Sequence, residues 1–359
     1  MHNCLEAQAQ ARYEAALERQ RIVTQIFSNS FTVETPWLLP AIDIPSDITP
    51  ATINFTFMGQ EHSIQAEANL HIYYGAKKAD RIELWNNLWW QDNTFDEARH
   101  LALYYNELAF EPQMDHAIDS VLIQLREIRD TRDLSNDEYI ELIVKYVQSI
   151  PYCHVHGTLE EERPIGCPRT PIQTLVEGTG DCDETGMLMA VLLHREGFPV
   201  SLLNFEEEWH MAVGLRIEGE GFDGTGYAYV EPTTFSYISD VPEILEGGIT
   251  IESSPVVIPM GDEIRNPMPY FSEEALAEIA RIIDVRDRAE AAATGLRNRI
   301  ERTPMSLAEF NRQRALHDAC FVALNRFRGV EPCPRGSINT DFMDRPQAIE
   351  WINQNAWWE

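Results

Sequence analysis

The residues best suited to chemistry are a cysteine, a histidine and a glutamate: Cys182, His210 and Glu231. A thiol can attack a carbonyl carbon, an imidazole can take and return the proton, and a carboxylate can orient the imidazole. Each residue alone is ordinary, because a lone cysteine is usually structural and a histidine often simply begins a strand. Together, on elements that bring them into contact, they predict the activated thiol that acyl transfer requires.

The sequence around Cys182 predicts the start of a helix. Asp181 and Glu184 have the types and spacing of a capping box, which makes Cys182 the first helical residue. The positive end of the helix dipole lowers the pKa of a thiol there and favours the thiolate. The neighbouring carboxylates oppose this effect, so a histidine must pair with the thiol. Residues 187–193 are all apolar, which predicts that the helix is buried.

His210 and Glu231 fall on two predicted strands joined by a glycine-rich turn. Apolar residues alternate along 210–217, as in a strand, and a second strand covers 227–231. If the hairpin is centred between residues 220 and 221, His210 and Glu231 stand directly opposite each other. Their Cβ atoms then lie about 4.5–5.5 Å apart, close enough for the carboxylate to orient the imidazole. The turn could shift this register by a residue or two.

Five segments together resemble the transglutaminase-like superfamily, in particular its prokaryotic thiol-hydrolase branch. They are VQSIPY at 147–152, RTPIQTL at 169–175, GDCD at 180–183, HMAVG at 210–214 and YVEPT at 229–233. The similarity covers about residues 135–240. By this resemblance Cys182 matches the nucleophile, His210 the base and Glu231 the acidic third member, where many relatives carry Asp. It implies an α+β fold with a papain-like core, in which the cysteine-bearing helix packs on an antiparallel sheet.

Acyl transfer also needs hydrogen-bond donors for an oxyanion. The backbone N–H of Cys182 is the first donor that we expect. A second would come from upstream in the chain, where Gln173 and Tyr152 are the candidates. The alternative interpretation of each is structural: a loop amide for Gln173 and a packing aromatic for Tyr152.

The chain divides into three predicted parts. Residues 1–130 form an N-terminal, mainly helical region with a few strands, 131–260 the transglutaminase-like catalytic domain, and 261–359 a C-terminal helical extension. The first part opens with a predicted helix over 4–27, which is rich in Ala, Glu, Gln and Arg. In the second part, residues 153–180 are rich in Pro and Gly and predict a long connecting loop.

Local signals place three further elements. Ser135 and Glu138 form a capping box for a helix that stops before Pro151. Ser272 opens a C-terminal helix rich in Glu and Arg. Alternating residues between 31 and 74 predict a few strands.

Four further side chains, within fifteen positions of one another, could hold zinc. They are Cys153, His154, His156 and Cys167. Their spacing matches no compact zinc motif well, and a Cys153–Cys167 disulfide or unpaired loop residues are the alternatives. Cys320 and Cys333 could also pair in an oxidising compartment. We therefore expect neither a metal nor another cofactor.

The charge of the chain narrows the range of partners. Asp and Glu number 58 against 28 Lys and Arg, a formal net charge of −30 at pH 7. Such a surface repels phosphate backbones and anionic lipids, which argues against nucleic-acid binding. No stretch approaches the roughly 18 consecutive apolar residues of a membrane span, and the N-terminus has no signal-peptide pattern. We expect a soluble, cytoplasmic protein, or an extracellular or surface-anchored one if a signal or anchor has been removed.

These features favour an enzyme that acts on amide or isopeptide bonds of a protein or peptide substrate. Water as the second reactant gives a cysteine peptidase, and an amine gives a cross-linking transglutaminase; the ordinary abundance of water favours hydrolysis. A non-catalytic binding module that keeps the fold is the alternative from another class. A metal-dependent hydrolase built on His154 and His156 is a third. The oligomeric state is left open.

Overall fold

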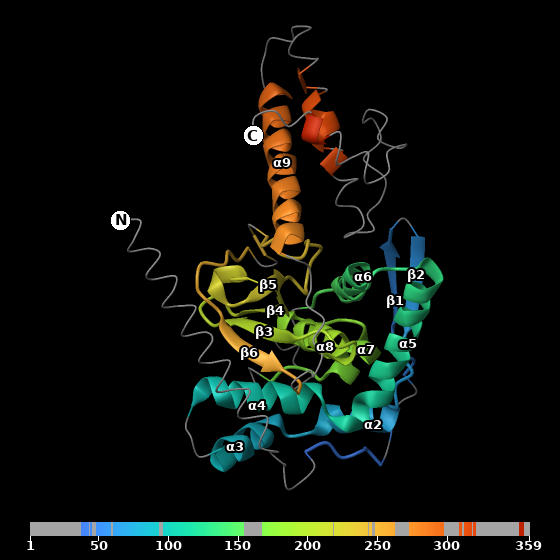
Figure 1. Cartoon of the computed structure of the whole chain (residues 1–359). Coiled ribbons are helices and arrows are strands. Elements are labelled where there is room, and N and C mark those ends of the chain that lie inside the picture. Colours follow the sequence, from blue (N-terminus) through green and yellow to red (C-terminus); the bar gives the residue numbers. More distant parts are fainter. Residues whose placement is uncertain are drawn as a thin grey trace. The chain divides into compact units, whose positions relative to one another are not determined.

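The structure is a computed structural model in which the chain forms two compact units (Figure 1). The first unit holds Met1–Phe55 and Ser63–Tyr270, and the second holds Thr56–His62 and Phe271–Glu359. Within them the structure describes residues 37–42, 44, 48–58, 60–92, 96–153, 167–217, 219–242, 244–245, 248–262, 273–297, 309–310, 312–317, 319–320 and 352–354. These residues form helices together with antiparallel strands, so the α+β class predicted from the sequence is confirmed.

A four-stranded antiparallel sheet with the order β5-β4-β3-β6 lies at the centre of the first unit. Its strands are β3 (Val200–Phe205), β4 (His210–Arg216), β5 (Tyr227–Val230) and β6 (Val256–Met260). The inner strands β3 and β4 are buried along almost their whole length. This pattern is expected of strands that are covered on both faces of a sheet.

Helix α8 (Cys182–Arg195) covers one face of this sheet, as the ribbon in Figure 1 shows. Gly186 in the helix lies against Leu202 of β3 and Met211 of β4. The segment from Met187 to Leu193 is fully buried, which confirms the buried helix predicted from its apolar sequence. The other face of the sheet carries a separate apolar cluster of Leu203, Phe205, Ala212 and Tyr229, packed under loop residues.

Several helices surround α8 and the sheet. They are α2 (Leu70–Lys78), α3 (Arg81–Asp92), α4 (Glu97–Ala109), η1 (Pro112–Met114), α5 (Asp115–Arg132), α6 (Asn136–Gln148) and α7 (Pro171–Glu177). Of these, α4, α5, α6 and α7 contact α8 directly. The helices that precede residue 131 therefore belong to the same compact unit as residues 131–270.

Several local predictions can be compared with the structure. The Ser135–Glu138 capping box is present, and α6 ends at Gln148, before Pro151. Strands β1 (Thr52–Phe57) and β2 (Gln60–Gln65) form a two-stranded sheet in the region where strands were predicted. The predicted helix over 4–27 lies outside the described residues.

The long loop predicted over 153–180 is wrong in its second half, because α7 occupies it. Pro171 is the first residue of α7, a position where its missing N–H costs no helical hydrogen bond. Thr170 and Gln173 close a capping box at this end. At the other end Gly178 takes a left-handed conformation with a φ of 66°, which only glycine adopts without strain.

In the second unit, α9 covers Glu273–Arg297. It begins where a helix was predicted after Ser272. Ile282, Val285 and Ala289 are buried at helical spacing along it, and Arg281 donates a hydrogen bond of 2.7 Å to Asn353. Residues 309–310, 312–317 and 319–320 are also helical.

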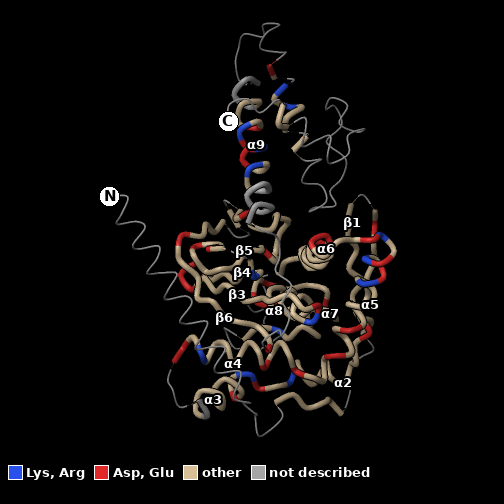
Figure 2. Tube along the Cα trace, in the orientation of Figure 1, with Lys and Arg blue, Asp and Glu red and all other residues tan. Residues whose placement is uncertain are grey.

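Acidic residues are distributed over most elements of the described chain, as the red segments of Figure 2 show. No single described element therefore accounts for the net charge of −30. Among the helices that the structure describes, none has the length and apolar character needed to cross a bilayer.

Candidate active site

Cys182 begins α8, as predicted. Asp181 is the N-cap residue, and its side chain accepts a hydrogen bond of 3.2 Å from the backbone N–H of Glu184. The Glu184 carboxylate in turn accepts one of 3.1 Å from the backbone N–H of Asp181. The capping box therefore fixes the backbone on both sides of the thiol.

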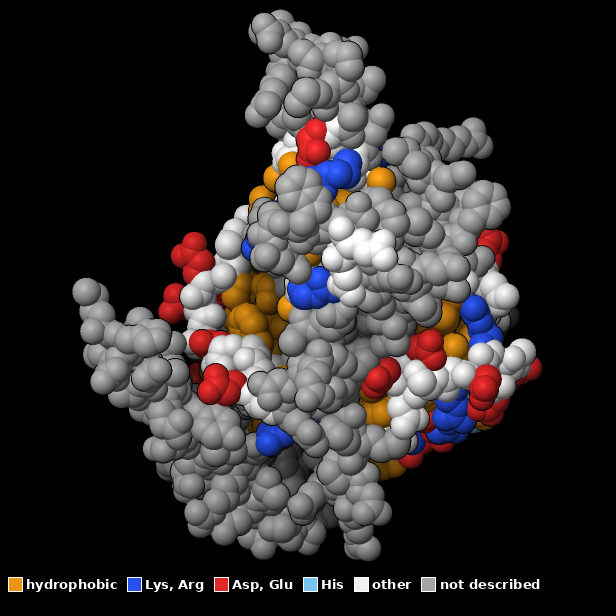
Figure 3. All heavy atoms as spheres, turned by 45° about the horizontal axis from the view of Figure 1, so that its top comes forward, with side chains coloured by type: hydrophobic (Ala, Val, Ile, Leu, Met, Phe, Trp, Pro, Cys, Tyr) orange, Lys and Arg blue, Asp and Glu red, His pale blue; other side chains and the backbone are white. Residues whose placement is uncertain are grey.

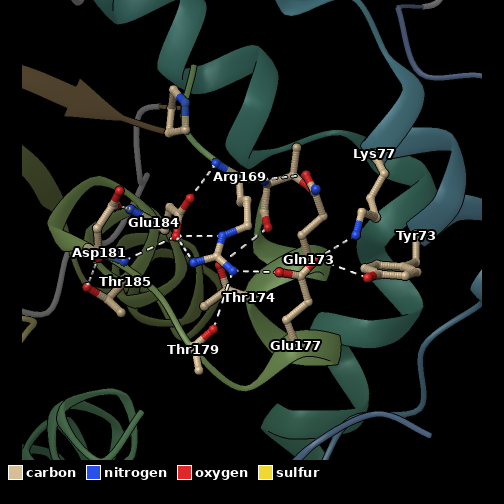
Figure 4. A network of polar contacts seen from close by, with 12 residues as sticks. Tyr73, Lys77, Arg169, Gln173, Thr174, Glu177, Thr179, Asp181, Glu184 and Thr185 are labelled. Atoms are coloured by element: carbon tan, nitrogen blue, oxygen red, sulfur yellow. Dashed lines mark hydrogen bonds and ion pairs between the residues drawn. The ribbon is translucent and has the colours of Figure 1, made fainter. Parts of the chain in front are cut away.

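A buried ion-pair network holds this first turn in place (Figure 4). Arg169 is only 1% exposed, and its Nε donates to Glu184 Oε2 at 2.8 Å, while its backbone N–H donates to Glu184 Oε1 at 2.9 Å. Its Nη1 donates to Glu177 of α7 at 2.5 Å. The guanidinium therefore joins the end of α7 to the start of α8. Sequence reasoning missed this network, because Arg169 and Glu177 give no sign of burial in their own segment.

The thiol of Cys182 is buried beside a carboxylate and a backbone carbonyl. Its Sγ lies 3.7 Å from Asp183 Oδ1 and 4.0 Å from the carbonyl oxygen of Trp209. Burial, followed by the negative charges of Asp183 and Asp181, raises the pKa of the thiol well above its usual value. The expected opposition of the carboxylates to the helix dipole is present, and desolvation adds to it, so the net shift of the thiol pKa is upward. The direction of this shift favours the protonated thiol.

The pKa values of two neighbouring carboxyl groups, those of Asp181 and Asp183, are also raised. Burial raises the pKa of Asp183, although the Tyr105 hydroxyl donates a hydrogen bond of 3.2 Å to its Oδ2. Burial and the charges of Glu184 and Asp183 raise the pKa of Asp181 to about 8.

His210 and Glu231 are in direct contact. The imidazole Nε2 lies 3.0 Å from Glu231 Oε2, and both side chains are buried. His210 is the first residue of β4, and Glu231 follows the last residue of β5. The pairing that the sequence predicts between these two side chains is present.

The predicted register of this hairpin is wrong by two residues. Tyr229 pairs with Gly214 rather than with Ala212, so His210 and Glu231 are not directly opposite. Their side chains still meet diagonally, because an even shift leaves each strand residue on the same face of the sheet. The 3-10 turn Phe222–Gly224 lies in the connection, which makes the loop asymmetric and moves the centre of the hairpin.

Glu231 accepts three further hydrogen bonds. The Tyr229 hydroxyl donates to Oε2 at 2.5 Å, and the Thr233 hydroxyl and backbone N–H donate to Oε1 at 2.5 and 3.1 Å. Burial alone would raise the pKa of Glu231. The hydrogen bond and charge of His210, together with the hydrogen bonds from Thr233 and Tyr229, lower it instead. Sequence reasoning missed Tyr229 and Thr233, although positions two residues from Glu231 on an extended chain share its side.

The Cys182 thiol lies against the backbone at the start of β4, where His210 is the first residue. The thiol contacts the Trp209 carbonyl, and the Met211 backbone N–H makes a hydrogen bond to it that lowers its pKa against the stronger effect of burial. These two residues flank His210 in the chain. The bond from Nε2 to Glu231 leaves Nδ1 as the ring nitrogen for proton exchange with the thiol. A nucleophile, a base and an orienting carboxylate thus gather in one part of the first unit.

The two oxyanion candidates lie in different surroundings. Tyr152 forms a β-bridge with Gly180, so it lies beside the segment that leads into Cys182. Gln173 is buried, and its Oε1 accepts hydrogen bonds from Arg81 at 2.7 Å and from the Thr170 backbone N–H at 3.1 Å. The oxygen of Gln173 is therefore a helix cap, and an oxyanion role for either residue stays a prediction.

The possible zinc ligands are described only in part. Cys153 and Cys167 are present as thiols and form no disulfide with each other, whereas His154 and His156 lie outside the described residues. Cys333, the predicted partner of Cys320, also lies outside them. Over the part of the chain that the structure describes, no three His, Cys, Asp or Glu side chains form a group suited to a metal ion.

No family model matches the chain, and neither the curated proteins nor the solved structures include one that is significantly similar to it.

Proposed function

We propose that this protein is a cysteine-dependent hydrolase of amide bonds in peptides or proteins, acting through Cys182, His210 and Glu231. The observation that carries the proposal is the buried contact of 3.0 Å between His210 Nε2 and Glu231, at the strand end where the Cys182 thiol lies. A carboxylate that binds one ring nitrogen fixes the tautomer of the imidazole, so that the other nitrogen can accept the thiol proton.

The raised pKa of the thiol determines the order of proton transfers. Because Cys182 is protonated at rest, His210 Nδ1 takes the proton as Sγ attacks the carbonyl carbon of the amide. The resulting imidazolium is stabilised by Glu231 and gives its proton to the leaving amine when the C–N bond breaks. Water, deprotonated by the same imidazole, then attacks the thioester, which releases the acid and restores the thiol.

The fold of the first unit supports the same proposal at the level of architecture. A helix that carries the cysteine at its N-terminus packs on an antiparallel sheet that carries the histidine at a strand start. We propose that this arrangement corresponds to the papain-like core that a transglutaminase-like protein would have. We include that family assignment in the proposal, and it covers about residues 135–240.

Hydrolysis and transamidation share every step up to the thioester. They differ in whether water or an amine reaches it, which depends on how the site excludes water. We favour hydrolysis, because water needs no acceptor site. The test supplies the wild-type protein with casein and a fluorescent primary amine. If the amine is incorporated into casein faster than casein is cleaved, the protein is a transglutaminase and the peptidase proposal is wrong.

The deciding experiment replaces the nucleophile. Cys182→Ala removes a small side chain at a helix start, so the melting temperature should stay close to the wild-type value. Cleavage of a fluorescent peptide library should fall by several orders of magnitude, as expected when a covalent nucleophile is lost. Cys153→Ala and Cys167→Ala are the controls and should keep the wild-type rate.

Activity of Cys182→Ala within tenfold of wild type contradicts the proposal. The alternative of a non-catalytic module predicts no cleavage by any variant, together with slow and uniform iodoacetamide labelling of all six cysteines. If the protein is an enzyme, a peptide aldehyde should bind at the active site and protect Cys182 selectively from labelling.

A further inference from the structure

Trp209 is the residue before His210, and it is exposed where a tryptophan is normally covered. Its side chain is 83% exposed, while its own carbonyl oxygen lies 4.0 Å from the Cys182 thiol. Apolar side chains reach the surface elsewhere on the protein too (Figure 3), so exposure alone does not distinguish Trp209. Its position does, because this side chain stands on the backbone that forms the edge of the candidate site.

The backbone of Trp209 is strained. Its φ is 52°, in the left-handed region, which costs a bulky side chain free energy that glycine or asparagine would not lose. The strain is maintained from both sides. Phe205 and His210 pair across the turn, and Glu208 accepts hydrogen bonds from the backbone N–H groups of Glu252 and Ser253 at 2.8 and 2.7 Å. Strained residues of this kind cluster at active sites and ligand-binding sites, which makes Trp209 a candidate for a functional residue.

The turn that carries Trp209 is acidic. Glu206 and Glu207 are exposed in the same four-residue connection between β3 and β4. Glu208 is ionised: burial opposes this, but hydrogen bonds from the Ser253 side chain and from backbone N–H groups lower its pKa. A cation near this turn is therefore attracted by the local carboxylates and by the net charge of −30 on the chain.

We infer that Trp209 is a specificity residue that receives a basic side chain of the substrate, Lys or Arg, beside the scissile amide. The indole face binds the cation by a cation–π contact, and tryptophan is the best aromatic residue for this. Glu206 and Glu207 add electrostatic attraction. The inference rests on the proposed hydrolase function and assigns its substrate class: peptides with a basic residue at the cleavage point.

The test compares substrates that differ only in charge. Three internally quenched peptides of Gly and Ala carry one central arginine, citrulline or norleucine. Citrulline has the shape of arginine without the positive charge. For the wild-type protein, kcat/KM should be higher for the arginine peptide than for the citrulline peptide by about 2- to 30-fold, the range of cation–π contacts from exposed to desolvated sites.

Trp209→Gly then separates recognition from folding. Glycine is unstrained at a positive φ and keeps the carbonyl that contacts the thiol, so the melting temperature should be unchanged or higher. The arginine-to-citrulline ratio should fall toward one, through a higher KM for the arginine peptide. Trp209→Phe should restore part of the ratio. Trp90→Ala, which removes an exposed tryptophan of α3, is the matched control and should leave the ratio unchanged.

A wild-type ratio of one, or a ratio that Trp209→Gly leaves unchanged, overturns the inference. Binding provides a readout that does not need turnover. Calorimetry with Cys182→Ala should show tighter binding of the arginine peptide than of the citrulline peptide, and the added Trp209→Gly change should remove the difference. If that difference appears but the wild-type protein cleaves neither peptide, the hydrolase proposal fails and the recognition site stands. If cleavage occurs without any charge preference, the hydrolase proposal stands and the recognition site at Trp209 is wrong.

Discussion

Replacing Arg169 with Met tests how the first turn of α8 is held. The change removes a guanidinium that is 1% exposed and bound to two carboxylates, Glu184 and Glu177. Glu184 is also 1% exposed, so its buried charge would lose the guanidinium that neutralises it, whereas Glu177 is partly exposed and can be hydrated. Removing one partner of a buried ion pair costs about 3–5 kcal/mol of unfolding free energy, and we expect Arg169→Met to lose that amount.

A second substitution checks whether the uncompensated charge is the cause. Glu184→Gln keeps the side-chain oxygen that caps Asp181 but carries no charge. We expect Arg169→Met combined with Glu184→Gln to be more stable than Arg169→Met alone, because the double variant contains no isolated buried charge at Glu184. Arg288→Ala is the control: it breaks an exposed pair with Asp284 in α9, worth about 0–1 kcal/mol.

The assay is urea unfolding of the full chain followed by circular dichroism, with the slope of free energy against urea required to stay constant between variants. A loss below about 1 kcal/mol for Arg169→Met would contradict the reasoning, since it would make the buried pair no stronger than a surface one. So would a double variant that is as unstable as the sum of the two single changes.

Two further predictions concern the residues around the thiol. Glu231→Gln should lower the rate by about 10- to 10⁴-fold, the range between a helpful and an essential orienting carboxylate, and an unchanged rate would reduce Glu231 to a strand-end residue. The lowered pKa of Glu231 stabilises the fold above its ordinary value of 4.5, and that contribution is lost as the pH falls through the lowered pKa; acid melts should therefore destabilise the wild type more than Glu231→Gln. Asp183→Asn removes a charge that raises the pKa of Cys182, so iodoacetamide should alkylate the thiol faster at neutral pH. Asp119→Asn is the distant control, and equal alkylation rates in the two variants would exclude the charge effect.

Local rules predicted the start of α8 correctly. The capping box of Asp181 and Glu184 involves residues three positions apart, so no information from the rest of the fold is needed. The apolar run after it predicted burial for the same reason. The box of Thr170 and Gln173, with Pro171 between them, gave an equally local signal for α7, but the surrounding Pro and Gly residues outweighed it in the prediction of a loop.

The register of the β4–β5 hairpin depends on how the turn is built. A symmetric turn was assumed, whereas the structure contains a 3-10 segment at Phe222–Gly224 and a left-handed Asp223 with a φ of 47°. The positions of the glycines alone do not determine how many residues belong to such a turn. The contact between His210 and Glu231 was nevertheless predictable, because only the parity of the register decides which face a side chain occupies.

The state of the thiol could not be predicted from its neighbours in sequence. The helix dipole acts on any residue at that position, whereas desolvation depends on Tyr105, Trp209 and other groups brought there by distant segments. The same holds for Arg169, whose partners Glu177 and Glu184 lie on two helices. The pKa of Cys182 and the burial of Arg169 both depend on contacts between segments that are distant in the sequence.

The complete enclosure of α8 has a consequence for motion. A helix whose segment from Met187 to Leu193 is covered by the sheet and by α4, α5, α6 and α7 cannot fray into solvent by itself. Its amide hydrogens can then exchange with deuterium only when the whole unit opens, so they should be the slowest to exchange in the first unit. Cys182 therefore begins a helix that does not unfold locally, and any rearrangement that admits a substrate must come from the segments around this helix.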